Sequence, residues 1–596
     1  MKKIGMLCFG IYFILTAGML LAQGHSDIIQ ISTAENIQHI AQTECDPVNN
    51  QYLVVWEDYR NNPVESDIYG QFVMDDGTLK GENFIICDAT GDQWWPSLAF
   101  DPANQRFLVV FEDNRNGGDQ GDITGVFIDS NGDFVDAPTS RTTDHTFAVC
   151  SESHDIYTCS VAYNYLEQVY LVVWGDNRAL GDVSGEQWGV DIYGQLMSSD
   201  GTLILPENPE ENFAVDNSDH YEASDPDVTY NEFTNEFFVA YGTSIGYVLG
   251  QRVNHLAQRV NPDGTVGGLP KVSRTNSVVP AMLVSESFNT NPDILQARVR
   301  ARIEYVYSRM EKVGATLDTE VLVAWRGENS STSPGYGYDI HGQRVGFIHD
   351  GEKYTAVYLG LDGVQTEELS NFAISLQPEN VAPPELAYST YDDEFLVSWG
   401  DPRNGGWQNH DLYAQRLDID MTGNMLFMDD DRVNTVTHFE NIPVDITEIT
   451  ENSPLGIAHN PVTNKFLVAY QYNDPESGRD IYGHIFYGTE MPVSEMDSRE
   501  IQHPDAFQLP GNYPNPFNPT TTIAFQIPDP THVTVCIYDL QGKIIAELLN
   551  EFIPAGSNKV RWDGKNDQGM NVPSGIYVCC VQSSEYLESI KMMLLR

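Results

Sequence analysis

Basic residues are scarce in this chain. Its 596 residues include 32 Lys and Arg against 86 Asp and Glu, which gives a formal net charge of −54. Proteins that bind nucleic acids neutralise phosphates with an excess of basic side chains, so this charge excludes nucleic acid as a partner. An acidic excess of this size keeps an extracellular protein soluble and attracts divalent cations. Calcium is therefore the one cofactor that the composition suggests.

Cysteine is sparse as well, with eight in the chain. Their spacing matches neither a zinc site nor a dense disulfide framework. Cys8 falls within the N-terminal apolar leader, and the remaining seven are an odd number, so at least one thiol stays free or pairs between molecules. In an oxidising compartment, the chain order suggests two pairings, Cys45 with Cys87 and Cys150 with Cys159.

Familiar catalytic motifs are missing. The sequence contains no G-x-S-x-G elbow, no H-E-x-x-H and no P-loop. A glycosidase needs two carboxyl groups about 5–10 Å apart, and 86 acids give no way to choose a pair. We assign no catalytic residue. A binding function is favoured, and an enzymatic function stays the alternative.

Long apolar runs occur only at the N-terminus. Lys2 and Lys3 precede IGMLCFGIYFILTAGMLL, and LAQ offers a cleavage point after Ala22, a pattern typical of a secretory signal over residues 1–22. A retained membrane anchor is the alternative, but no second apolar run of spanning length follows. The sequence therefore predicts export, with a secreted or cell-surface location.

A repeat occupies most of the chain. Seven apolar runs such as YLVVW and FLVVF end on an aromatic residue, and most are followed by a segment of the type DIYGQFV. Asp-Gly dipeptides at Asp76-Gly77, Asp200-Gly201 and Asp263-Gly264 indicate tight hairpins. The aromatic anchors are Trp56, Phe111, Trp174, Tyr241, Trp325, Trp399 and Tyr470.

Four short strands in each of seven units predict an all-β fold, a seven-bladed β-propeller over residues 23–488. Tandem β-sandwiches are the main rival, but they need about seven strands per 100 residues. The segment DIIQISTAENIQ near the mature N-terminus is similar to the closing strands of other units. We expect it to complete the last blade and to remove an open sheet edge. Alternating apolar residues from Leu295 to Tyr307 predict the first strand of the fifth unit.

An acid–arginine pair of the form D-x-R follows four of the anchors. Enzymes on propellers assemble one site from different residues of several blades, whereas this pair recurs. We therefore interpret it as an Asx-type turn with an ion pair that fixes a hairpin. The recurring aromatic anchor is interpreted as packing between blades. The pairs are Asp58 with Arg60, Asp113 with Arg115, Asp176 with Arg178 and Asp401 with Arg403.

One acidic loop in the second unit, DNRNGGDQGD, clusters oxygen donors at short spacing. It lacks the residue order and the distal Glu of an EF-hand loop. A chance acidic loop is the alternative in so acidic a chain. The candidate calcium ligands are Asp113, Asn116, Asp119 and Asp122.

The composition changes where the repeat stops. Residues 489–506 are predicted to be a linker. From Phe507 onward, prolines and then alternating strands with glycines at the turns predict a small Ig-like β-sandwich over residues 507–596.

Residues 507–596 closely resemble a known family, the type A C-terminal sorting domain of type IX secretion substrates. The resemblance is carried by YPNPFNPTT, IYDLQGK, WDGKNDQG, SGIYV and the closing KMMLLR. It implies Sec export to the periplasm, passage to the outer-membrane surface directed by this domain, and the type IX machinery as a partner. The residues that match the sorting motif are Tyr513, Pro514, Asn515, Pro516, Phe517, Asn518, Pro519, Trp562, Asp563, Gly564, Gly575 and Tyr577.

Cys579 and Cys580 depart from the strand pattern of that family. Adjacent residues in a strand face opposite sides of the sheet. We therefore expect one of these thiols to be buried and the other exposed.

Three long insertions between predicted strands carry exposed aromatic candidates for ligand binding, and packing over the blade tops is their alternative role. The sequence as a whole predicts a secreted or cell-surface propeller that binds a protein or a carbohydrate. A secreted hydrolase, glycosidase-like or peptidase-like, with a site at the channel mouth is the alternative, and a purely structural surface component is a third class. The candidate ligand-binding residues are Trp188, Tyr336, Tyr338 and Trp407.

Overall fold

The structure is a computed structural model, and every regular element among the residues it describes is a β-strand. In the same part of the chain, no helix is long and apolar enough to cross a membrane. The predicted signal and linker lie outside the described residues. Described are residues 25–594 apart from 27, 117–120, 142–143, 152–155, 179–189, 205–211, 217–221, 232–233, 246–251, 268–281, 289–300, 307–316, 329–337, 350–353, 360, 362–364, 367–371, 376–380, 390–393, 403–410, 420–424, 429–441, 446–452, 475–477, 489–507, 514–520, 528–530, 539–542, 554–555, 563, 567–569, 571, 574 and 584–585.

The chain forms two compact units, and the first ends at Thr489. Its first blade is a four-stranded antiparallel sheet in chain order. The strands of this blade are β2 (Gln38–Asp46), β3 (Gln51–Asp58), β4 (Asp67–Met74) and β5 (Leu79–Cys87).

Five further sheets repeat this plan, with a short extra hairpin strand or two before the outermost strand. The second contains β6 (Gln93–Asp101), β7 (Arg106–Asp113), β8 (Asp122–Asp129), β9 (Phe134–Val135) and β10 (Phe147–Cys150). The third contains β11 (Ile156–Asn164), β12 (Val169–Asp176), β13 (Asp191–Ser198), β14 (Leu203–Ile204) and β15 (Phe213–Asp216). The fourth contains β16 (Glu222–Asn231), β17 (Glu236–Ile245), β18 (Arg252–Val260), β19 (Val266–Gly267) and β20 (Met282–Phe288).

The fifth blade contains β21 (Ala301–Val306), β22 (Leu317–Glu328), β23 (Tyr338–His349), β24 (Tyr354–Leu359), β25 (Gln365–Thr366) and β26 (Phe372–Ser375). The sixth contains β27 (Glu385–Ser389), β28 (Glu394–Asp401), β29 (Asp411–Ile419), β30 (Met425–Met428) and β31 (Ile442–Asp445). Strand β21 is the first strand of its blade, which agrees with the prediction for residues 301–306, whereas residues 295–300 and 307 of the predicted strand lie outside the described residues.

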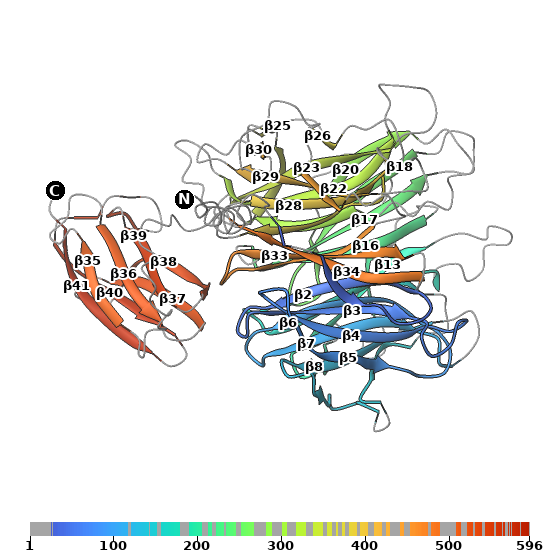
Figure 1. Ribbon diagram of the computed structural model, residues 1–596. Helices are drawn as coiled ribbons and strands as arrows, with labels where there is room; N and C mark the ends of the chain where they lie inside the picture. The colour runs from blue at the N-terminus through green and yellow to red at the C-terminus, as the bar shows by residue number, and fades with distance from the viewer. Residues whose placement is uncertain are drawn as a thin grey trace, which may run out of the picture. The chain divides into compact units, whose positions relative to one another are not determined.

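The seven sheets close into a ring, which Figure 1 shows from the side. Each innermost strand contacts the next one around the ring, in the order β2, β6, β11, β16, β21, β27 and β32 (Ser453–Asn460). Strand β32 then contacts β2, so the circuit is complete. The predicted all-β, seven-bladed propeller is confirmed.

The last blade takes one strand from the N-terminus. Strands β32, β33 (Lys465–Asp474) and β34 (Gly478–Tyr487) come from the end of the repeat, and β1 (Ile29–Ser32) pairs antiparallel with β34. Ile29 lies opposite Gly483, and Ile31 is buried in a core shared by the last and first blades. The leading strand therefore occupies the outer position that its similarity to other closing strands predicted.

The aromatic anchors pack between blades, because each lies on a second strand that is apolar on both faces. Trp174, for example, is fully buried in one cluster with Leu108 and Phe147 of the preceding blade. All seven anchors are at most 2% exposed. The tight hairpins also form as predicted, since Gly77 has φ 84° and Asp76 accepts a 2.9 Å hydrogen bond from the Thr78 amide.

The second unit has two antiparallel sheets that enclose one apolar core. One sheet has the order β35, β36, β39, and the other β38, β37, β40, β41. The strands are β35 (Gln508–Tyr513), β36 (Thr521–Ile527), β37 (Thr531–Tyr538), β38 (Ile544–Ile553), β39 (Gly556–Trp562), β40 (Gly575–Gln582) and β41 (Leu587–Leu594).

Two residues of the sorting motif build this core. The rings of Trp562 and Tyr577 lie edge to face with centroids 5.1 Å apart, and the Tyr577 hydroxyl donates to the Pro573 carbonyl at 2.8 Å. Gly564 occupies a turn at φ 74°, Gly575 opens β40, and Tyr513 ends β35. The motif residues Pro514 to Pro519 and Asp563 lie outside the described part of the chain.

No disulfide joins any of the seven described cysteines. Cys45 and Cys87 lie on β2 and β5, which are separated by two strands, a span of about 14 Å that no disulfide bridges. The pairing suggested for them is therefore wrong. Cys150 and Cys159 lie on different blades and have other partners, since Cys150 donates to Asn212 and Cys159 to the carbonyl oxygen of Trp95.

Candidate functional site

The D-x-R pair fixes the turn between the second and third strands. In the first blade the Asp58 carboxylate accepts hydrogen bonds from the Arg60 amide and Nε, both at 2.8 Å, and from the Trp56 indole at 2.7 Å. The Arg60 guanidinium also lies 4.1 Å from the centre of the Tyr69 ring. Carboxylate, turn amide and anchor thus form one buried unit.

The same unit recurs in other blades. Asp176 accepts from the Arg178 amide at 2.8 Å and from the Trp174 indole at 3.2 Å. Asp113 accepts from the Arg115 amide at 3.1 Å, and the Trp399 indole donates to Asp401 at 3.0 Å. The interpretation of the pair as a structural turn is confirmed by these contacts, and Arg403 lies outside the described residues.

The candidate calcium ligands are engaged in contacts of the same recurring kind. The Asn116 amide donates to Asp122 at 2.8 Å, as Asn61 does to Asp67 in the first blade. Burial raises the pKa of both of these aspartates. Asp119 lies outside the described residues, and within the described part of the chain no group of three acidic, His or Cys side chains is placed to hold a metal.

Of the four aromatic residues predicted to bind ligand, the structure describes Tyr338 alone. Trp188, Tyr336 and Trp407 lie outside the described residues. Tyr338 opens β23, where its backbone pairs with Glu328. In sequence, Trp188, Tyr336 and Trp407 lie between the second and third strands of their blades.

A different recurring feature lies on the innermost strands, near the end of each sheet where the second strand finishes. In five blades the first and second strands shift register by one residue, which is a β-bulge. In blades one to four the bulged residue has a left-handed backbone, with φ 55° at Ile40, 51° at Trp95, 34° at Thr158 and 50° at Asp225. Non-glycine residues rarely adopt this conformation, because it costs about 1–3 kcal/mol.

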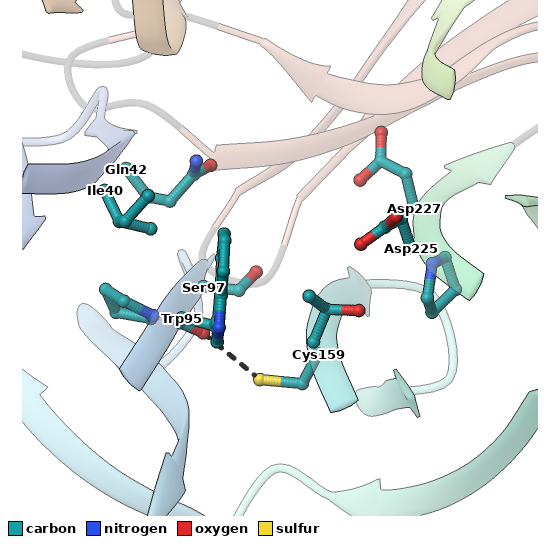
Figure 2. Close-up of a pocket in the computed structure, with 10 residues that line it drawn as sticks. Ile40, Gln42, Trp95, Ser97, Cys159, Asp225 and Asp227 are labelled. Carbon is teal, nitrogen blue, oxygen red and sulfur yellow. Dashed lines mark hydrogen bonds between the residues drawn. The ribbon is translucent and has the colours of Figure 1, made fainter. Parts of the chain in front are cut away.

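The four bulges converge on one pocket, hereafter the bulge pocket. It is a small concavity that is partly open to solvent. Figure 2 shows the Trp95 indole in the middle, with Ile40 and Gln42 on one side and the carboxylates of Asp225 and Asp227 on the other. Its lining residues are Ile40, Gln42, Trp95, Pro96, Ser97, Thr158, Cys159, Asp225, Pro226 and Asp227.

Hydrogen bonds between blades hold the walls of the bulge pocket. The Trp95 amide donates to Glu57 of the preceding blade at 2.7 Å. Further round the ring, the Ser97 hydroxyl accepts from the Val161 amide at 3.2 Å, and the Ser160 hydroxyl donates to Asp227 at 3.0 Å. Every wall of the pocket is therefore tied to the next blade.

The Thr158 hydroxyl and the Cys159 thiol, both in the pocket wall, differ in their contacts. Thr158 is 7% exposed, and in the described part of the chain its Oγ1 has no hydrogen-bond partner. The Cys159 thiol donates to the Trp95 carbonyl at 3.5 Å, and burial raises its pKa. A hydroxyl of this kind is able to serve a ligand, whereas the thiol is inert.

Two ionisable groups of β2, His39 and Glu44, lie close in sequence to the pocket residues Ile40 and Gln42. Burial, with the charge of Arg479 as a lesser cause, lowers the pKa of His39 to about 4, so this ring is neutral near pH 7. Glu44 lies two residues beyond Gln42, on the strand face opposite the core residue Cys45. Burial raises the pKa of Glu44 to about 7 despite a 2.8 Å bond from the Cys45 amide.

Sequence reasoning missed the bulge pocket, although it left a trace. Trp95 and Asp225 each precede a proline at the start of an inner strand. A residue before proline is restricted in its backbone conformation, and a proline within a strand is typical of a bulge.

Comparison with known proteins finds a family match for part of the second unit. A family model, the FlgD Ig-like domain, matches residues 512–585. No curated protein matches the chain.

Several solved structures are similar to the whole chain at low identity. A GH93 α-L-arabinofuranosidase of Fusarium graminearum is 10% identical, with 78% of this chain and 98% of that chain covered and a TM-score of 0.37. The periplasmic gluconolactonase PpgL of Pseudomonas aeruginosa is 15% identical, with 74% and 97% covered and a TM-score of 0.35. PorZ, a surface component of the type IX secretion system of Porphyromonas gingivalis, is 12% identical, with 93% and 81% covered and a TM-score of 0.16. At these identities and scores, the likenesses carry no information on ligand or chemistry.

Proposed function

We propose that this protein is a secreted or cell-surface β-propeller that binds an extracellular carbohydrate in the bulge pocket. One observation carries the proposal. The bulge has the same strained backbone in four blades, yet its side chain is aliphatic in Ile40, aromatic in Trp95, a hydroxyl in Thr158 and a carboxylate in Asp225. Strain that persists at one place in a fold is a sign of function, and a set of different groups can recognise an asymmetric ligand.

The chemistry of these groups suits a sugar. An indole face packs on the apolar face of a pyranose ring, while carboxylate, amide and hydroxyl groups bind ring hydroxyls. The bulge pocket is a small, partly open concavity, so it can contact one face or edge of a small ligand and does not admit a folded protein. The pocket therefore favours a carbohydrate over a protein ligand.

Binding is tested on the mature full-length protein. A glycan array identifies ligands, and calorimetry measures affinity for wild type, Trp95→Ala and Trp94→Ala. Trp94 is the matched control, because it is adjacent to Trp95 in sequence, is hydrogen-bonded to the Tyr59 side chain and does not line the pocket. We expect Trp95→Ala to weaken binding by about tenfold or more, while Trp94→Ala leaves the affinity unchanged. Equal affinities in all three proteins would contradict the assignment of the site.

A hydrolase is the second candidate, favoured by one specific observation. Glu44 is a carboxyl group with a pKa of about 7 on the inner strand that also supplies Gln42 to the pocket. A carboxyl that keeps its proton near pH 7 can act as a general acid, with Asp225 or Asp227 as the second carboxylate. The test is turnover of whichever glycan binds. Turnover that Glu44→Gln abolishes, with binding retained, would establish the enzyme, and binding without turnover would leave the binding module.

The export route belongs to the same proposal. The leader over residues 1–22 and the resemblance of residues 507–596 to a type A sorting domain support Sec export followed by type IX secretion, and the FlgD Ig-like match supports the Ig-like character of that segment. In a bacterium with a type IX system, deletion of residues 507–596 should leave the propeller in the periplasm. Secretion of the truncated chain at the wild-type level would refute the sorting role.

A further inference from the structure

Two cysteines of the second unit lie directly opposite each other. Strands β37 and β40 pair antiparallel without a register shift, and this register places Cys536 opposite Cys580. The two neighbouring pairs are Val535 with Val581 and Ile537 with Cys579. The sequence separates these thiols by more than 40 residues, so their pairing is visible only in the fold.

The two thiols also share one face of the sheet. Val535, Ile537, Cys579 and Val581 belong to the apolar core of the unit, and they alternate along their strands with Cys536 and Cys580. Cys536 and Cys580 therefore point away from the core, on the outer face. Cys536 is buried there and Cys580 is partly exposed, whereas Cys579 is fully buried in the core.

The spacing of such a pair suits a disulfide. Opposed residues of antiparallel strands have Cα atoms about 4.5–5.5 Å apart, within the range of about 4.4–6.8 Å found for disulfides. Cβ atoms about 4.5 Å apart in the closer kind of pair need only a small adjustment to reach disulfide distance. Neither Cys579, which faces the core, nor any propeller cysteine is opposed to another cysteine in a register of the described strands.

We propose that Cys536 and Cys580 form a cross-strand disulfide when the folded protein meets a disulfide oxidant. The thiolate of Cys580, the more exposed of the two, attacks one sulfur of the oxidant and releases one thiol. The thiolate of Cys536 then attacks the mixed disulfide and releases the second thiol. The two cysteines together lose two protons and two electrons, and the oxidant disulfide is reduced to two thiols. The product links the two central strands of the sheet β38, β37, β40, β41.

The test uses the mature full-length protein in its native state. One sample is treated with oxidised glutathione and another with dithiothreitol, and each is then unfolded in an alkylating agent, digested and analysed by mass spectrometry. We expect a cross-linked peptide pair containing Cys536 and Cys580 only after oxidation, with Cys579 alkylated in both samples. Cys579→Ala should leave the cross-link unchanged and removes the ambiguity of adjacent cysteines. Cys536→Ser and Cys580→Ser should each abolish it.

A second measurement shows that the bond forms within the fold. Closing a loop of this length should raise the midpoint of thermal unfolding of the second unit by roughly 5 °C or more, and Cys536→Ser should lose that rise. Alkylation of both Cys536 and Cys580 after oxidation would overturn the proposal. A bond that uses Cys579 or a bond between two chains would overturn it equally. So would a failure of maleimide to label Cys580 in the native Cys536→Ser protein.

Discussion

Two recurring features of the propeller differ in what they conserve from blade to blade. The D-x-R turn repeats both backbone and side chains, so that Asp58 and Asp176 hold the same amide, guanidinium and indole groups. The left-handed bulge of the inner strand repeats the backbone alone, and its side chain differs in each of the four blades that have it. Identical side chains in every copy serve the fold that all copies share. Different side chains on a shared strained backbone form a site that only the assembled ring contains.

The largest effect is expected from breaking the turn. Asp58→Ala leaves the Arg60 guanidinium and the Trp56 indole without their buried acceptor, which should cost about 3–5 kcal/mol of unfolding free energy. Urea unfolding followed by tryptophan fluorescence measures the loss. Asp88→Ala, at an exposed acid, is the control and should stay within about 0.5 kcal/mol. A loss below about 1 kcal/mol for Asp58→Ala would contradict the claim that the D-x-R turn stabilises the fold.

A smaller effect is expected at the seam of the ring. A Cβ atom added at Gly456 of β32 would lie 2.7 Å from the Thr43 backbone nitrogen of β2. Gly456→Ala should therefore push the last blade from the first and cost about 1–3 kcal/mol. Thermal unfolding measures it, with Gly575→Ala as the control because no atom lies within 4 Å of its added Cβ. Equal stability of the two variants would argue against such close contact of β2 and β32.

Glu44 should make stability depend on pH. Its pKa is about 7 in the fold and near its usual value of about 4.5 in the unfolded chain. The folded state thus binds more protons, so stability is highest below about pH 4.5 and falls as the pH rises through 7. Glu44→Gln removes this penalty and should stabilise the protein by about 1–2 kcal/mol at pH 8 with little effect at pH 4.5. Unfolding midpoints of both proteins at the two pH values test it, and parallel pH curves would contradict it.

The smallest change in stability is expected at the bulge itself. Ile40→Gly relieves a left-handed backbone that costs a β-branched residue about 1–2 kcal/mol, and this gain offsets the lost burial. Its unfolding free energy should lie within about 1 kcal/mol of wild type, while affinity for the bound glycan falls. Ile68→Gly is the matched control, because Ile68 is fully buried in ordinary strand conformation and should lose several times more. Comparable losses at both positions would show that Ile40 is ordinary core.

The architecture could be predicted from the sequence because the same sequence pattern recurs in seven units. Seven anchors, the recurring Asp-Gly turns and the similarity of DIIQIS to other closing strands each report the same unit. The faces of Cys579 and Cys580 followed from strand alternation alone. Local patterns that repeat can be checked against one another, so errors in a single copy matter little.

The bulge pocket could not be predicted by the same means. The four bulged residues are separated by about 55 to 70 residues and are of four different types, and only Trp95 and Asp225 are followed by proline, so no single pattern relates all four. What relates them is a positive φ at one register position, which depends on pairing with the second strand. The pairing of Cys536 with Cys580 is hidden for the same reason, since register between distant strands is a property of the sheet.

The pairing of β1 with β34 sets the moment at which the ring can form. Ile29 finds its partner Gly483 only after the whole repeat has emerged, so the last blade has an open edge until then. Pairing of β1 with β34 then completes the sheet of the last blade, and the strands at the two ends of the propeller stabilise each other within that sheet.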